Sequence, residues 1–170
     1  MSRALVVYES FWGNTERVAR AVADGIAEVM SVDVREVGAA PSGVEGVDLL
    51  VVGGPTHAFS MTRPSTRHDA LEQGGTVRHP EAGLREWVDA LPEAPQTWVA
   101  AFDTRVSRVR RLPGSAAHAA DRRLHRHGMP RAAPPESFWV AGTSGPLEAH
   151  ELDRARSWGH TVADVVPATV

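Results

Sequence analysis

The chain has 170 residues, 42% of them hydrophobic, and a formal net charge of −3, which suits one domain over residues 1–170 with one sizeable core. It contains no cysteine, and all 18 of its Lys and Arg positions are arginine. These absences exclude disulfides, thiolate metal sites, lysine Schiff bases and the lysine-dependent phosphate loop of nucleoside triphosphatases.

Short apolar runs predict the strands of a parallel sheet. Four runs are dominated by apolar, β-branched and aromatic residues, as expected for strands buried on both faces: 4–8, 48–53, 97–102 and 137–141. Residues 31–37 alternate valines with charged residues, which indicates a strand with one wetter face at the edge of the sheet.

Apolar stripes at spacings of three and four predict helices between these strands. The clearest stripe begins near Asn14 and continues to Val29, and others cover 84–91 and 152–162. An alanine-rich segment after Pro113 indicates a further helix. Strands alternating with helices predict an α/β domain with a five-stranded parallel sheet and helices on both faces.

Two segments, Thr62–Gly75 and Arg105–Leu112, lack a periodic pattern and are expected to be irregular. Both follow the carboxyl end of a predicted strand. Open α/β sheets bind ligands in the crevice outside these strand ends, so the segments are expected near a ligand site.

The connection between the first strand and the first helix, residues 9–16 (ESFWGNTE), suits a phosphate. A helix N-terminus offers unpaired amide groups and a partial positive charge, and Ser10, Asn14 and Thr15 add polar side chains. The loop lacks both GxxxxGK[ST] and GxGxxG, which argues against triphosphate and dinucleotide ligands. The alternative is that Asn14 or Thr15 only caps the helix.

Three motifs resemble those of flavodoxins. SFWGNT, after ALVVYE, is similar to their phosphate loop, which has a hydroxyl residue, two variable positions and then Gly-Asn-Thr. GGPTHAFSM is similar to the loop that flanks the isoalloxazine ring in flavodoxins and flavodoxin-like quinone reductases, and FDTR stands at the position of the second flavin loop. The resemblance spans the chain and implies a flavodoxin-like three-layer sandwich with strand order 2-1-3-4-5 and FMN as the cofactor.

The resemblance also assigns residues to FMN. The phosphate would be held by Ser10, Gly13, Asn14 and Thr15, with the amides of Phe11 and Trp12. The ring would lie between Pro55, Thr56, His57, Ala58 and Phe59 on one side and Phe102, Asp103, Thr104 and Arg105, taken as a loop after the fourth strand, on the other. Trp12 is a departure, because many flavodoxins have threonine or serine there.

Three functions remain open at this point. The resemblance favours a low-potential electron carrier that serves redox partner proteins. An NAD(P)H-dependent quinone or flavin reductase is the second candidate, and a non-redox binding module that kept the fold is the third. His57 is either a proton donor or a packing residue. No secretory signal or apolar run of about 18 residues is present, so we expect a cytoplasmic protein with no membrane partner.

Residues 105–131 contain eight arginines and one acid, Asp121. This basic region is either a solvated surface or a docking surface for an acidic redox partner or NADPH. It lacks the interleaved aromatic residues of single-strand binding proteins, so no nucleic acid is expected. Three histidines in this region, His118, His125 and His127, do not share one helix face, and we expect no metal there.

Overall fold

The computed structural model describes residues 1–168, which form an all-parallel, five-stranded sheet in the order β2-β1-β3-β4-β5. The strands are β1 (Arg3–Tyr8), β2 (Ser31–Glu36), β3 (Leu49–Pro55), β4 (Trp98–Val106) and β5 (Glu136–Val140). This confirms the predicted fold class and strand order, with the valine-alternating strand β2 at one edge.

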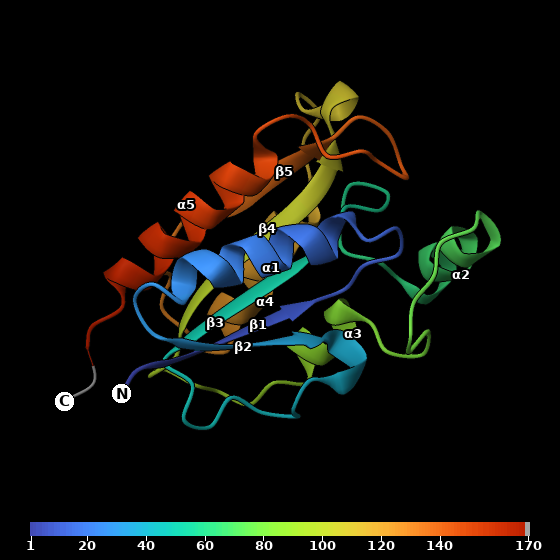
Figure 1. The fold of residues 1–170 in the computed structure, drawn as a ribbon. Helices are drawn as coiled ribbons and strands as arrows, with labels where there is room; N and C mark the ends of the chain where they lie inside the picture. The colour runs from blue at the N-terminus through green and yellow to red at the C-terminus, as the bar shows by residue number, and fades with distance from the viewer. Residues whose placement is uncertain (169–170) are drawn as a thin grey trace.

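Helices cover both faces of the sheet (Figure 1). The helices are α1 (Asn14–Ile26), α2 (Pro64–Glu72), α3 (Leu84–Asp89), α4 (Ala116–Arg126) and α5 (Glu151–Val165), with the short 3₁₀ turns η1 (Val37–Ala39) and η2 (Ser107–Val109). Figure 1 shows α1 and α5 side by side on one face, while α2 stands apart from the layers. No helix in the described part of the chain has the length and apolar character that a membrane span requires.

The two faces of the sheet carry separate apolar cores. Val6, Val51 and Phe102 pack with α1 and α5, whereas Leu5 and Leu50 pack with α3 and α4. Strands buried on both faces need apolar residues at every position, which explains the continuous apolar runs of β1 and β3.

Helices α1 and α5 approach closely because two glycines meet their partners' backbone. A Cβ atom on Gly25 would lie 1.9 Å from the Arg156 carbonyl oxygen, and one on Gly159 would lie 2.1 Å from that of Val22. Any side chain at either position would push the two helices apart. This contact fixes α1, whose N-terminus opens on the candidate site.

The expectation that Thr62–Gly75 is irregular is wrong, and the same expectation for Arg105–Leu112 is only partly right, because that segment contains the end of β4 and the turn η2. Thr62–Gly75 contains helix α2, which has no apolar stripe and buries only Arg67 and Ala70. Its signals are local: Pro64 takes the first helical position, and the Arg63 amide donates to Thr66 Oγ1 (2.9 Å). The first helix is also shorter than predicted, since it ends at Ile26.

The fourth strand is longer than predicted, because β4 continues to Val106. Residues 102–105 are therefore strand and not loop. They pair with both neighbours: Asp103 lies opposite Gly54 of β3 and Ser137 of β5. Polar residues at a strand end suggested a loop, but the ladders on both sides keep the backbone extended.

Candidate functional site

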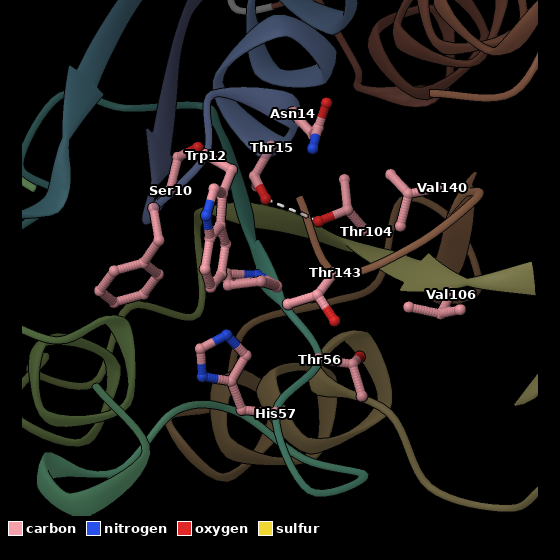
Figure 2. A pocket seen from close by; sticks show the side chains of 12 residues that line it. Ser10, Trp12, Asn14, Thr15, Thr56, His57, Thr104, Val106, Val140 and Thr143 are labelled. Atoms are coloured by element: carbon pink, nitrogen blue, oxygen red, sulfur yellow. Dashed lines mark hydrogen bonds between the residues drawn. The ribbon is translucent and has the colours of Figure 1, made fainter. Parts of the chain in front are cut away.

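The candidate site is a groove at the carboxyl ends of β1, β3, β4 and β5. It consists of two adjoining hollows that share Thr56, Val106 and Thr143. The small depression has a volume of about 80 Å³ and is lined by Ser10, Phe11, Trp12, Asn14, Thr15, Pro55, Thr56, His57, Thr104, Val106, Val140 and Thr143 (Figure 2). The slot has a volume of about 460 Å³ and is lined by Thr56, Ala58, Phe59, Arg105, Val106, Arg108, Val109, Gly142 and Thr143.

Helix α1 begins at the small depression without a side-chain cap. Gly13 is the N-cap residue, with φ 85° and ψ −8°, and its amide donates to Ser10 Oγ (3.1 Å). Among the described residues, no side chain caps this helix, whereas Ser115 caps α4 by accepting from the His118 amide (3.3 Å). The amides of the first turn of α1 are therefore available to an anion, and neither Asn14 nor Thr15 serves as the cap.

A buried hydroxyl pair joins this helix to the middle of the sheet. Thr15 Oγ1 and Thr104 Oγ1 lie 2.7 Å apart, and both side chains are buried. Figure 2 shows this bond between two of the residues that line the small depression. The pair links residues 89 positions apart in the sequence, so it holds the loop between β1 and α1 in a fixed position over β4.

Aromatic side chains fill the space between the loop that joins β1 to α1 and the loop after β3. The Phe11 ring is buried, and its centroid lies 5.4 Å from that of His57. The Trp12 indole is half-buried and hangs from the phosphate loop towards His57 (Figure 2). Burial lowers the pKa of His57, which keeps its imidazole neutral near neutral pH. Trp12 therefore narrows the small depression.

The tip of the loop after β3 is a strained turn. His57 and Ser60 exchange two backbone hydrogen bonds, of 2.9 and 3.1 Å, around Ala58 (φ 48°) and Phe59 (φ 60°). A left-handed conformation costs an L-residue about 1–2 kcal/mol, and glycine is the usual occupant. Arg85 supports the turn by donating to Ser60 Oγ (3.1 Å) and to the Met61 carbonyl oxygen (2.6 Å). Such strain is typical of ligand-binding segments.

The predicted second wall is only partly present. Phe102 packs in the core, with its ring 6.0 Å from that of Phe138, and Asp103 is fully buried on the opposite face of the sheet. Neither side chain lines the groove, so the expectation that Phe102 flanks a ring is wrong. Thr104 and Arg105 do reach the groove.

Residues beyond the predicted loop complete the groove. Val106, Arg108 and Val109 form the far side of the slot. Val140, the last residue of β5, and Gly142 and Thr143, which follow it, close the remaining side. The sequence motif did not include these residues, although the arginine-rich segment that follows β4 was a signal of its own.

Arg105 shapes the segment that forms this wall. Its guanidinium donates to the carbonyl oxygens of Val109 (3.1 Å) and Leu112 and lies 6.0 Å from the centre of the Trp139 ring. The side chain is buried. Arg105 thus stabilises the conformation of residues 105–112. The exposed arginines, Arg108, Arg110 and Arg111, follow it in the sequence.

Asp103 is a buried carboxyl group beneath the groove. One oxygen accepts from the Ala117 amide (3.0 Å) at the start of α4, and the other has no hydrogen-bond partner among the described residues. Burial raises the pKa of this carboxyl group above its usual value. The folded protein therefore keeps the proton to a higher pH than the unfolded chain does.

This proton makes the stability depend on pH. The stabilisation is complete below the ordinary pKa of aspartate, about 3.9, and is lost as the pH rises through the raised folded-state pKa. We expect Asp103→Asn to flatten the fall in unfolding free energy above pH 4, as measured by urea unfolding at a series of pH values. If the unfolding free energy of Asp103→Asn fell with pH as steeply as that of the wild type, the pH dependence would not come from Asp103.

The comparisons with known proteins place this fold among those of solved flavodoxins. No family model matches the sequence, and no curated protein matches it. A flavodoxin from the domain Archaea is 20% identical, with 95% of this chain and 96% of that chain covered and a TM-score of 0.66. The fold is flavodoxin-like.

Two further flavodoxins superpose as well. The flavodoxin of Streptococcus pneumoniae TIGR4 is 17% identical over 97% of this chain and 100% of that chain, with a TM-score of 0.68. Oxidised flavodoxin 1 of Bacillus cereus is 15% identical over 96% and 98%, with a TM-score of 0.67. The flavodoxin-like domain thus spans nearly the whole length of these proteins.

Proposed function

We propose that this flavodoxin-like protein binds FMN in the groove and carries electrons between redox partners. The observation that carries the proposal is the uncapped first turn of α1, which opens on a depression continuous with an apolar-walled slot. When bound, FMN would supply the one- and two-electron chemistry that this cysteine-free chain lacks.

The residues present fit the parts of FMN. The amides at the start of α1, with the side chains of Ser10 and Asn14, suit the phosphate. Phe59, Val106 and Val109 offer the slot the apolar walls that a flat ring needs. The slot volume of about 460 Å³ lies within the range of ordinary ligand sites.

The charges around the groove bear on the reduction potential. Arg105 and Arg108 line the slot, and no acidic residue lines either hollow. Positive groups favour the negative charge that reduction adds to a flavin, so they raise its potential. We therefore propose a carrier whose potential lies above the low-potential range that the flavodoxin resemblance implied.

The exposed Arg108 also keeps the reductase alternative open, because arginine suits the phosphates of NAD(P)H. Anaerobic mixing of the FMN-loaded protein with NADPH separates the two functions. Rapid loss of the flavin absorbance would establish a reductase. Inertness towards NADPH, combined with reduction by dithionite, would support a carrier.

Titration of the protein with FMN tests the proposal directly. We expect one FMN per chain, with quenching of the flavin fluorescence and competition by inorganic phosphate. A protein that takes up no FMN would overturn the proposal and favour a non-redox binding module.

Trp12→Thr is expected to tighten FMN binding by about tenfold. The change widens the small depression and adds a hydroxyl donor, and a hydrogen bond to a charged group contributes about 1.5–3 kcal/mol. Trp98→Phe, at the opposite end of β4, is the control. Unchanged or weaker binding by Trp12→Thr would show that the indole supports the ligand instead of obstructing it.

A further inference from the structure

Two of the four loops that form the groove carry arginines, and none of the four carries an acidic residue. Residues 10–15, 55–63, 104–115 and 141–147 contain five arginines and no aspartate or glutamate, although the whole chain has a net charge of −3. The rest of the molecule is correspondingly acidic. The groove face therefore carries a net positive charge, and the rest of the molecule carries a net negative charge.

Three of these arginines lie exposed in the segment that follows β4. Arg108 and Arg111 are exposed, and neither makes a hydrogen bond or an ion pair with any residue that the structure describes. Arg110, between them, stacks on Trp139 at 4.9 Å from the ring centre and lies 3.6 Å from Glu148. Arg108 and Arg111 thus present two unneutralised cations, while the Arg110 side chain is held against Trp139 and Glu148.

Apolar side chains lie among these cations. Phe59 is 50% exposed and Leu112 is 48% exposed. The segment that follows Leu112 comes close to Phe59, because a Cβ atom on Gly114 would lie 2.7 Å from the Phe59 carbonyl oxygen. We call Phe59, Arg108, Arg110, Arg111 and Leu112 the mouth surface. An apolar centre with charged surroundings is the usual anatomy of a protein interface.

The other arginines of the basic region lie elsewhere. Helix α4 starts beside Thr56, whose hydroxyl accepts from the Ala116 amide (2.9 Å), and runs about 16 Å away from the groove. Arg131, beyond its end, pairs with Asp121 (2.8 Å) and bridges to Val99, near the start of β4. The eight arginines thus form two separate groups, and only the first surrounds the slot.

We infer that the mouth surface docks an acidic redox protein, one that presents carboxylates around its own redox centre. The inference rests on the proposed function, because it puts the partner against the open side of the slot. The basic mouth attracts a negatively charged partner and orients it while the acidic remainder of the chain repels it. A basic partner would be oriented the opposite way, with its redox centre far from the slot.

The test uses two probes: an acidic plant-type [2Fe–2S] ferredoxin and a basic mitochondrial-type cytochrome c. Binding to each is measured by interferometry at low and at physiological salt, with and without FMN. The variant Arg108→Glu/Arg111→Glu is compared with Arg122→Glu/Arg126→Glu, which makes the same charge change at the far part of α4. Circular dichroism checks that both variants are folded.

We expect the ferredoxin to bind the wild type and to lose at least about tenfold in affinity in Arg108→Glu/Arg111→Glu, with the control variant within about twofold of the wild type. Added salt should weaken the wild-type complex. Equal losses in both variants, no ferredoxin binding at low salt, or preferred binding of cytochrome c would overturn the inference. FMN titration of the same samples separates the two proposals, because charge-dependent docking without FMN uptake refutes the carrier alone.

Discussion

Replacing Gly13 by valine is expected to weaken FMN binding by about ten- to a hundredfold. Gly13 has φ +85°, a region that β-branched residues rarely enter. A Cβ atom there meets nothing within 4 Å, so the cost comes from the backbone and not from a clash. Strain of this kind amounts to about 1–3 kcal/mol, and the loop relieves it by turning its amides away from the phosphate.

Asparagine at the same position is the matched control, because it tolerates the left-handed region while still adding a side chain. We expect Gly13→Asn to bind FMN within a few-fold of the wild type. Fluorescence titration measures both affinities, and thermal unfolding without FMN measures the strain by itself. Wild-type affinity in Gly13→Val would show that the phosphate does not lie at this loop.

The strands were predictable because their signals are local, whereas their order followed from the resemblance to flavodoxins. Each central strand is a continuous apolar run, since both of its faces are buried, and the only strand that alternates polar and apolar residues lies at an edge. The start of α1 at Asn14 was predictable for the same reason, because the apolar stripe that marks it lies within one helix. Such features need no knowledge of the tertiary structure.

The second wall of the groove was not predictable in this way. Asp103 and Thr104 are polar and suggest a loop, but ladders to β3 and β5 carry β4 on to Val106. Thr104 then meets Thr15 across 89 positions of sequence. Helix α2 was not predicted for a related reason. It buries only two residues, and its sequence signals are the proline at its first position and the hydrogen bond from the Arg63 amide to Thr66 Oγ1.

A buried polar network beside the groove holds residues 62–84 in place, which include the segment 62–75 that has no periodic pattern in the sequence. Glu9, at the end of β1, accepts a hydrogen bond from Thr62 Oγ1 and another from the Leu84 amide (3.2 Å). Arg67 Nη1 donates to Thr62 Oγ1 (3.1 Å), and Arg67 pairs with Glu86 (2.9 Å). Burial raises the pKa of the Glu9 carboxyl group. One acidic side chain thus fixes both ends of residues 62–84.

Glu9→Ala is expected to lower the unfolding free energy by about 3 kcal/mol, because it leaves the Thr62 hydroxyl and the Leu84 amide buried without an acceptor, at about 1–3 kcal/mol each. Glu9→Gln should lose about 1 kcal/mol, since its amide oxygen still accepts from Leu84 and its NH₂ group donates to Thr62 Oγ1. Urea unfolding measures both. Only Met61 separates the turn at 57–60 from Thr62, so FMN affinity should fall more in Glu9→Ala than in Glu9→Gln. Equal stability of the alanine variant and the wild type would mean that the segment holds its place without Glu9.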